Sequence, residues 1–457
     1  MSHRELATAG ATPAAAGTPA IPDIETPVVA SMGLPGPILW TLIVLSGAAA
    51  ALGGWCWSVQ IQRGMVVTGL QNTEGWGVYI TNFVFWVGIA HCGTLVSAIL
   101  FLFRARFRTA VYRAAEMMTV IAVTTAGLFP ILHVGRPWFA YWLFPYPNQR
   151  HLWVNFKSPL LWDVFAVSTY FTVSAVFLFV GMIPDLAALR ARVSGWRSKL
   201  YGLLSLGWRN SDGEWRSFGR GYLFFAALAT PLVISVHSVV SWDFAMAILP
   251  GWHSTLFAPY FVAGAIFSGV AMLITLLIPL RRALGLSDLI TRHHLDMLGQ
   301  LVLFTSLIVA YSYGTEFFLA AFGGTALERS TFAYRAFGSY APFFWTMVFC
   351  NCINPMLLFF KRFRTTTAGL LWVCIPVNVG MWLERFVIIA TSLSHNQEPF
   401  TWRIYHPSLY EAGITLGSFG WFFFWYLILV KVMPSLSIAE LKESAHGEDE
   451  EVVAHAA

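Results

Sequence analysis

Ten uninterrupted apolar stretches run through this sequence, and they restrict the chain to a fold that crosses a membrane many times. Each stretch is long enough to span about 30 Å of hydrocarbon, which takes roughly 20 residues of helix. The stretches begin near Ile38, Ile80, Tyr112, Leu160, Gly221, Ala258, Leu295, Ser339, Leu370 and Ala412. The sequence does not show the short alternating segments of a membrane β-barrel. It therefore predicts an all-α polytopic membrane protein with about ten transmembrane helices.

The composition agrees with this fold class. Of the 457 residues, 57% are hydrophobic and only 11% are charged, which is more apolar surface than a soluble core needs. The net charge of +5 does not indicate nucleic-acid binding, because no connecting segment combines Lys and Arg with aromatic residues as nucleic-acid readers do. The lipid bilayer is the partner that the composition predicts.

Short motifs recur in the two halves of the chain. Residues 159–163 read Pro-Leu-Leu-Trp-Asp, and residues 342–346 read Pro-Phe-Phe-Trp-Thr. An earlier pair, residues 85–93 and 261–269, places two glycines at matching positions. Internal repeats of several helices are common in membrane proteins that build a site between them. We therefore predict two repeated four-helix bundles, flanked by the first and last helices.

The two halves differ in their titratable groups. The first half has Asp163 where the second has Thr346, and His133 where the second has Ser312. A purely architectural acid or histidine should be needed in both copies. The joint loss predicts that the first bundle carries the working site.

These observations divide the chain into five parts. We expect a disordered cytoplasmic tail over 1–36, the first helix with the site-bearing bundle over 37–257, and the second bundle over 258–410. The last transmembrane helix follows at 411–433, and an acidic cytoplasmic tail at 434–457. Acidic segments that are poor in apolar residues stay unfolded.

Lys and Arg are divided unevenly between the two sets of connecting segments. With both termini inside, the inner side holds 20 of the 28 and the outer side holds 8. The positive-inside rule therefore predicts that both termini are cytoplasmic. Seven of these basic residues lie in 185–220 beside three tryptophans, a composition that favours an interfacial amphipathic helix.

The five cysteines, at 56, 92, 350, 352 and 374, fall inside predicted helices, and none belongs to a Cys-x-x-Cys motif. Covalent c-type haem and iron-sulfur clusters normally require such motifs. We therefore expect no haem, iron-sulfur cluster or other metal site in this chain. Any electrons must pass to another subunit.

The strongest candidate site lies at the predicted periplasmic edge. His133 ends the third predicted helix and Asp163 lies about one turn into the fourth. An imidazole and a carboxylate can accept the two protons that a hydroquinone loses as its electrons leave. We predict that both are catalytic and that Arg136 and Trp162 help to bind the quinol. The structural alternatives are that Asp163 caps its helix or pairs with Arg136, and that His133 only anchors a helix end.

A second outer segment, residues 238–261, contains Asp243 and His253 but no Lys or Arg. We include both residues in the predicted quinol-binding set, where they would complete the site or carry protons away. Helix capping and loop hydrogen bonds would explain them almost as well.

Ionisable groups buried in the membrane are functional candidates by default. We predict a proton path that includes His91, Glu116, His237, Asp296, Glu384 and Arg385. His91 and His237 have two alternative roles, as haem ligands or as hydrogen-bonded core residues. The acids of the second half, which include Glu316, have the alternative role of forming structural ion pairs. Because helix neighbours are about 100° apart, we expect Glu384 and Arg385 to find partners on other helices rather than each other.

Several segments together resemble the NrfD-like family of polysulphide-reductase membrane subunits. They are HVGRPWF at 133–139, SPLLWD at 158–163, VVSWDFAMAILPGWHSTLFAPYF at 239–261 and MWLERFVII at 381–389. From about residue 38 to 433 the chain also resembles the large quinol-oxidising membrane subunit of bacterial alternative complex III.

The resemblance implies that His133 and Asp163 occupy the quinol-site positions of the family, with menaquinol or ubiquinol as substrate. It also implies three kinds of partner, namely c-type haem subunits, a periplasmic iron-sulfur subunit and a related NrfD-like membrane subunit. A terminal oxidase, soluble cytochrome or copper protein would take the electrons, and proton translocation could accompany them.

Two other functions remain open. A secondary transporter also uses repeats and ionisable groups at the midplane, but its broken helices would place Gly or Pro at matching positions in both halves. Pro130 and Pro231 have no such counterparts at the repeat offset. A non-catalytic anchor for redox partners would bind no quinone and would tolerate loss of Asp163.

Overall fold

The computed structural model describes residues 25–103, 105–145 and 156–442. These residues form helices and no strand, and ten of the helices are long and apolar enough to cross a membrane. The ten spans are α2 (Pro37–Arg63), Gly77–Leu102 (α3, Gly77–Thr94; η2, Leu95–Ile99; α4, Leu100–Leu102), α5 (Tyr112–His133), α6 (Pro159–Leu189), α8 (Asp212–Ala245), α9 (Phe257–Ala283), α10 (Arg292–Gly323), Ala341–Phe359 (α12, Ala341–Val348; η5, Phe349–Ile353; η6, Asn354–Phe359), α14 (Thr367–Ser394) and α15 (Leu409–Val432). The predicted all-α polytopic membrane fold is confirmed.

Short helices connect the spans. They are α1 (Glu25–Ser31), η1 (Met65–Val67), η3 (Arg106–Arg108), η4 (Pro137–Leu143), α7 (Trp196–Leu204), α11 (Ala326–Phe337), α13 (Lys361–Thr365) and η7 (Pro399–Thr401). The predicted helix within 185–220 is present as α7, although the connection is shorter than expected. The span α8 begins at Asp212 because Ser211 and Glu214 form a capping box there, which satisfies free backbone N–H groups at the helix start.

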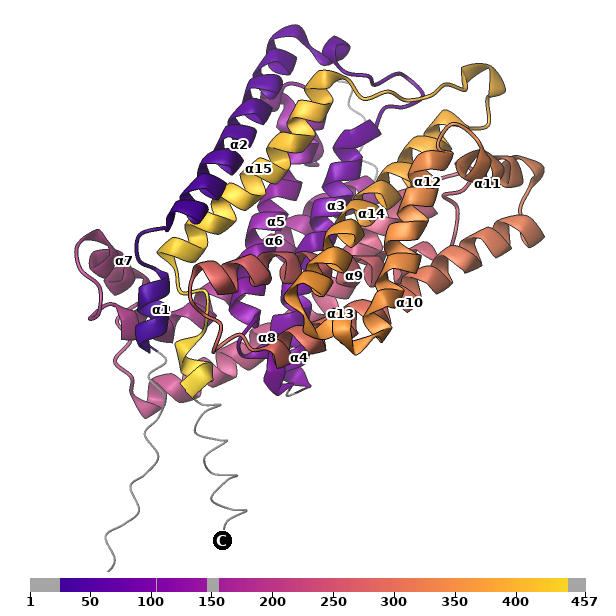
Figure 1. The fold of residues 1–457 in the computed structure, drawn as a ribbon. Coiled ribbons are helices and arrows are strands. Elements are labelled where there is room, and N and C mark those ends of the chain that lie inside the picture. The colour runs from indigo at the N-terminus through magenta and orange to yellow at the C-terminus, as the bar shows by residue number, and fades with distance from the viewer. Residues whose placement is uncertain (1–24, 104, 146–155, 443–457) are drawn as a thin grey trace, which may run out of the picture.

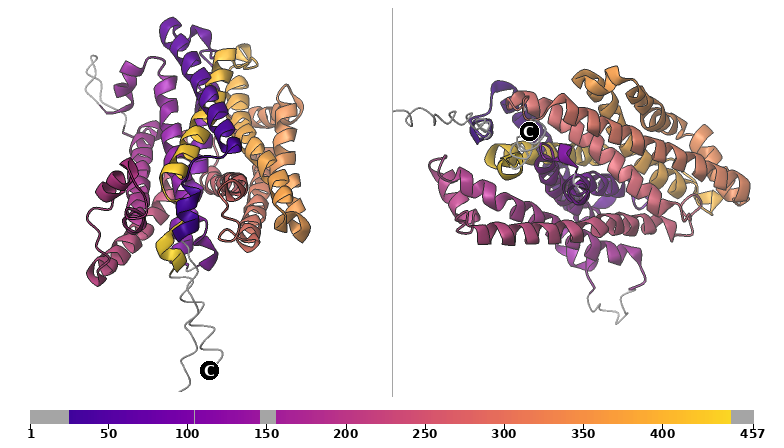
Figure 2. Two further views of the ribbon diagram at one scale, coloured as in Figure 1. Left: turned by 60° about the vertical axis from the view of Figure 1, so that its left-hand side comes forward. Right: turned by 90° about the horizontal axis from the view of Figure 1, so that it is seen from below.

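Helices α3 and α9 occupy the centre of the molecule, and the other spans surround them (Figures 1 and 2). They approach closely because Gly269 lies against α3, where a Cβ atom would come within 2.2 Å of the Cβ of Cys92. Helices α2 and α15 run side by side at one edge of the molecule (Figure 1). Gly53 and Gly417 face each other there and allow the two backbones to meet, as small residues do in membrane helix pairs.

The repeat is visible where α6 and α12 begin. Trp162 donates its indole N–H to the carbonyl of Phe156 at 2.6 Å, and Trp345 donates to the carbonyl of Ala336 at 2.9 Å. The next residues differ, because Asp163 is buried whereas Thr346 donates its hydroxyl to Pro342 of its own helix at 2.8 Å. The replacement of the acid by threonine therefore leaves no unpaired group in the second copy.

The repeat is not kept where α5 and α10 end. Helix α5 stops at His133, and Gly135 follows with φ at +85°, a backbone conformation that suits glycine. Helix α10 continues through Ser312 and Gly314 to Gly323. His133 thus ends a helix, whereas its counterpart lies inside one.

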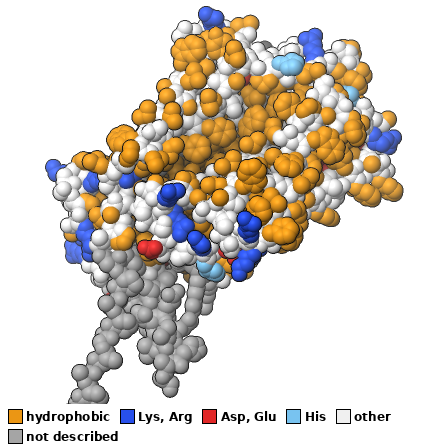
Figure 3. Space-filling model, in the orientation of Figure 1, with side chains coloured by type: hydrophobic (Ala, Val, Ile, Leu, Met, Phe, Trp, Pro, Cys, Tyr) orange, Lys and Arg blue, Asp and Glu red, His pale blue; other side chains and the backbone are white. Residues whose placement is uncertain are grey.

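Both described ends of the chain lie at one face, here called the terminal face, at the bottom of Figure 1. It carries residues 25–36, α7 and residues 433–442. The opposite face carries residues 64–76, 134–145, 246–256, 324–340 and 395–408. A broad apolar band separates Lys and Arg side chains near the two faces (Figure 3). The described parts of the two predicted tails include helix α1 and the packed segment 433–442, and the remaining residues of those tails lie outside the described chain.

Candidate functional site

Two aspartates meet near the opposite face. Asp163 lies one turn into α6, Asp243 lies near the end of α8, and their side chains are hydrogen-bonded to each other. Asp163 is 7% exposed, and neither carboxyl forms an ion pair with any described basic residue. Each also keeps one buried oxygen without a hydrogen-bond partner. A hydrogen bond between two carboxyl groups needs a proton on one of them.

The tryptophans that precede the two acids hold the pair in place. The rings of Trp162 and Trp242 pack edge to face with centroids 6.0 Å apart, a favourable arrangement for aromatic pairs. Sequence patterns did show both Trp-Asp dipeptides, but not that they meet. Helices α6 and α8 run in opposite directions, so a dipeptide near the start of one lies beside a dipeptide near the end of the other.

The two structural roles considered for Asp163 are not observed. The N-cap of α6 is Ser158, five residues before the acid. Arg136 is exposed in the connection after α5 and forms no ion pair with Asp163 in the part of the chain that the structure describes. The partner of Asp163 is another acid, which is costly in a buried site unless a proton is shared.

His133 ends α5 at the opposite face, beside helices α2 and α3. Its ring lies 5.9 Å from that of Tyr79 on α3, and its Nδ1 atom has no hydrogen-bond partner. Tyr79 donates to the Oε1 atom of Gln60 at 2.7 Å, and Gln60 donates to the carbonyl of Leu132 at 2.8 Å. These bonds fix the end of α5. His133 and Asp163 form no ion pair with each other among the described residues.

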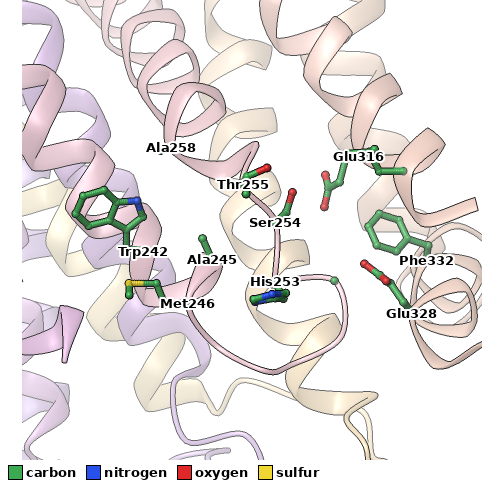
Figure 4. Close-up of a pocket in the computed structure, with 12 residues that line it drawn as sticks. Trp242, Ala245, Met246, His253, Ser254, Thr255, Ala258, Glu316, Glu328 and Phe332 are labelled. Atoms are coloured by element: carbon green, nitrogen blue, oxygen red, sulfur yellow. The ribbon is translucent and has the colours of Figure 1, made fainter. Parts of the chain in front are cut away.

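His253 lines a cavity of about 530 Å³ where α8, α9, α10 and α11 come together near the opposite face (Figure 4). Trp242 borders this cavity as well as the acid pair. Neither Asp163, Asp243 nor His133 lines it. None of the other residues of the predicted quinol-binding set lines this cavity.

His91 and His237 touch at the centre of the first bundle. Their ring centroids are 4.6 Å apart, and Tyr170 stacks on His91 at 4.9 Å. Both nitrogens of His237 and the Nε2 atom of His91 lack hydrogen-bond partners, whereas the Nδ1 atom of His91 contacts the carbonyl of Val87. A porphyrin held between two histidines must separate their rings. The direct contact leaves no space for it, so this pair does not fit the haem alternative.

Most of the other buried acids are paired with arginines. In the first bundle, Arg113 lies 3.1 Å from both Glu116 and Asp185. In the second, Arg335 contacts Glu316 at 2.9 Å and Arg364 contacts Asp296 at 2.5 Å. Glu316 and Asp296 therefore form ion pairs, as the structural alternative for them predicts.

The expectation that Glu384 and Arg385 do not pair with each other was wrong. An Arg385 nitrogen lies 2.9 Å from a Glu384 oxygen. Their side chains are long enough to bend together although their Cβ atoms point apart. Each also has a contact on another helix, because Tyr313 donates to Glu384 and the Arg385 guanidinium lies 4.1 Å from the ring centre of Phe261.

Sequence reasoning missed several buried polar residues around these groups. Arg113 and Asp185 carried a usable signal, since both are charged residues next to apolar stretches. Tyr170, Tyr313 and Asn351 carried none, because such side chains are common in membrane helices. Asn351 donates to the Tyr313 hydroxyl at 2.8 Å, which extends the polar cluster around Glu384.

The described residues hold no group of three His, Cys, Asp or Glu side chains close enough together to bind a metal ion. The five cysteines are free thiols.

Known proteins resemble this chain along most of its length. A family model described as "Polysulphide reductase, NrfD" matches residues 66–395. A putative dimethyl sulfoxide reductase membrane subunit of Halobacterium salinarum is 30% identical over 293 residues, which are 64% of this chain and 62% of that protein. A selenate reductase subunit of Mesobacillus selenatarsenatis is 21% identical over 415 residues, 85% of this chain and 92% of the relative.

A third relative is the Hdr-like menaquinol oxidoreductase integral membrane subunit of Archaeoglobus fulgidus, which is 22% identical over 239 residues. The match covers 51% of this chain and 49% of that protein, so the chain spans about half of the archaeal relative and about three fifths of the halobacterial one. The family match extends from η1 to the end of α14 and includes both bundles. This multi-pass membrane protein therefore belongs to the polysulphide reductase NrfD family.

Proposed function

We propose that this chain is the quinol-oxidising membrane subunit of a respiratory oxidoreductase of the alternative complex III type. The buried Asp163–Asp243 pair is the observation that carries the proposal, because it is a proton acceptor at one face of the membrane-spanning bundle. The name of the archaeal relative, a menaquinol oxidoreductase subunit, supports a quinol as substrate. Menaquinol and ubiquinol both fit this chemistry.

The proton balance of quinol oxidation matches the available groups. A hydroquinone releases two protons and two electrons as it becomes a quinone. The aspartate pair shares one proton and accepts one more, while the Nδ1 atom of His133 accepts the other. We assign Arg136, which is exposed, and Trp162, which precedes Asp163, to quinol binding. Proton acceptors within hydrogen-bond reach of the substrate are what general base catalysis requires.

The electrons leave for partner subunits in this proposal. We assign c-type haem subunits, an iron-sulfur subunit on the periplasmic side and a second NrfD-like membrane subunit as partners. A terminal oxidase, a soluble cytochrome or a copper protein is the final acceptor. The opposite face, which carries the acid pair, is then the periplasmic face of a bacterial inner membrane, and both termini are cytoplasmic. The names of the relatives, which are membrane subunits of reductases or oxidoreductases, support a multi-subunit assembly.

Replacement of Asp163 by Asn tests the proposal. The amide cannot take the second proton, so quinol-dependent reduction of the partner haems should fall by about 100-fold or more, with the complex still assembled. Thr346→Asn is the matched control, because Thr346 follows Trp345 at the same place in the repeat and bonds only within its helix. Equal turnover in wild type and Asp163→Asn would contradict the proposal.

Proton translocation is a finer part of the proposal. It is supported by the contact of His91 with His237, because three of the four ring nitrogens have no hydrogen-bond partner. Glu116, Asp296 and Glu384 lie in ion pairs instead. In vesicles, release of more than two protons per quinol would support translocation, and release of two would contradict it.

A further inference from the structure

The cavity beside His253 is a candidate binding site in its own right. Its volume of about 530 Å³ lies within the range of sites for small molecules. An adjoining cavity of about 370 Å³ shares Gly251, His253 and Glu328 with it. The proposed proton acceptors do not line either space, so the quinol chemistry described above leaves this cavity without a role.

One wall of the cavity is built from buried charged residues. Glu316 is 6% exposed and pairs with Arg335, which is 2% exposed. Arg335 also donates to Thr391 at 3.1 Å and to Ser392 at 3.3 Å. Gly251 closes over this group with φ at +81°, and a Cβ atom there would lie 3.0 Å from the guanidinium. These contacts hold the Glu316 carboxylate at the cavity surface.

The remaining lining is amphipathic. Trp242, Met246 and Phe332 provide apolar and aromatic surface, while His253 and Glu328 provide polar groups. Figure 4 shows the Glu316 and Glu328 carboxylates on one side of the space and His253 on the other. A flat ring with a hydroxyl at each end fits such a lining, because the apolar side chains cover its faces and a hydroxyl can donate to the carboxylates at its edge.

The charges of the lining argue against a phospholipid head group. A lipid phosphate needs Lys or Arg partners, and none lines the cavity, whereas two glutamates do. Arg335 lies behind Glu316 and is already paired. A neutral ligand avoids this conflict. Met246 is 55% exposed and Leu319 is 47% exposed at the rim, so an apolar tail can leave the cavity toward the bilayer.

We propose that this cavity binds the hydroquinone head group of a second quinol molecule, separate from the quinol at the Asp163–Asp243 pair. The ligand class rests on the proposed function, because a lipid-soluble ring with two polar ends is the substrate proposed there. The position and the lining of the cavity are independent of it. The second site is a binding site only, and no electron transfer is assigned to it.

Equilibrium binding of a short-tailed ubiquinol analogue, kept reduced, to the purified complex tests this proposal. Wild type should bind two molecules per chain. Leu319→Trp fills the rim of the cavity and should leave one. Leu307→Trp is the matched control, since Leu307 lies on the same helix and is 42% exposed outside the cavity. It should still bind two.

The outcomes separate the two proposals. The proposal of a second site is wrong if the Leu319→Trp variant binds as many molecules as wild type. This includes the case in which wild type binds one molecule and the variant still binds it. Quinol-dependent haem reduction that still requires Asp163 would then leave the proposed function standing. A phospholipid found in the cavity of the purified complex would also overturn the second site. Absence of any quinol binding would contradict both proposals.

Discussion

At the scale of single residues, Glu74 shows how a carboxyl outside the membrane spans can be buried without a cation. It is 1% exposed and accepts a hydrogen bond from Ser394, which also meets the Tyr340 hydroxyl at 2.8 Å. No described basic residue forms an ion pair with it. Burial raises the pKa of Glu74 to about 7, because the charged form is poorly solvated there.

This raised pKa predicts a pH-dependent stability. In the unfolded chain the Glu74 carboxyl ionises at a pKa of about 4.3, so the folded state binds the proton more tightly. Protonated Glu74 stabilises the fold fully below a pH of about 4.3. This contribution to the free energy of unfolding, on the order of 3 kcal/mol, is lost as the pH rises to about 7. The melting temperature of wild type should therefore fall between pH 5 and 8, relative to Glu74→Gln.

Glu398→Gln is the control for this measurement, because Glu398 is an exposed carboxyl on the same face. Its melting temperature should follow wild type at each pH. If Glu74→Gln and wild type keep a constant difference over this range, the pKa of Glu74 is not raised by burial.

At the scale of elements, the segment after α15 closes the terminal end of the first bundle. Glu440 lies 2.7 Å from Arg108, and the backbone N–H of Ala439 donates to Asp185 at 3.0 Å. Asp185 in turn pairs with Arg113. Residues 433–442 therefore complete a buried charge network that the transmembrane helices alone leave open.

Truncation after Met433 should destabilise the protein, because removing one partner from a buried charge network costs about 3–5 kcal/mol. We expect a melting temperature several degrees lower, measured on the detergent-purified complex. Truncation after Lys442 is the matched control, since it keeps Ala439 and Glu440, and it should melt like wild type. Equal melting temperatures for the two truncations would show that the segment does not support the fold.

At the scale of the whole molecule, the even number of spans places both described chain ends at the terminal face (Figure 1). The excess of Lys and Arg on this side predicts that it faces the cytoplasm. In the proposed function the aspartate pair then faces the periplasm, and protons released from the quinol there would contribute to the gradient. The direction of proton release therefore depends on the orientation of the whole chain.

Cysteine labelling tests this orientation. His406→Cys places an exposed thiol on the opposite face, and Lys199→Cys places one on α7 at the terminal face. A membrane-impermeant maleimide should label the first in intact spheroplasts and the second only after permeabilisation. The background should be low because four native cysteines are buried and Cys352 is half-buried. The reverse labelling pattern would contradict the predicted orientation.

The transmembrane helices were predictable, whereas their side-chain contacts were not. Nine of the ten predicted helix starts lie within three residues of the observed ones. Helix α8 begins nine residues before its predicted start, because its first residues are polar and a capping box stabilises the helix there. Asp163 was predicted from its missing counterpart in the repeat, but its partner was not, because the acids are 80 residues apart in the chain. The pairing of Glu384 with Arg385 was mispredicted because side-chain bending is not encoded in helix periodicity.

The sequence by itself determined that the chain crosses a membrane ten times, because hydrocarbon requires long runs of apolar residues whose backbone bonds are satisfied within helices. It also indicated that one repeat had kept an acid that the other had lost. Only the tertiary structure decided that Asp163 faces Asp243, that His91 touches His237 and that His253 lines a separate cavity. These contacts depend on how helices pack around α3 and α9, and close approach of glycines such as Gly269 sets that packing at distances that no local pattern specifies.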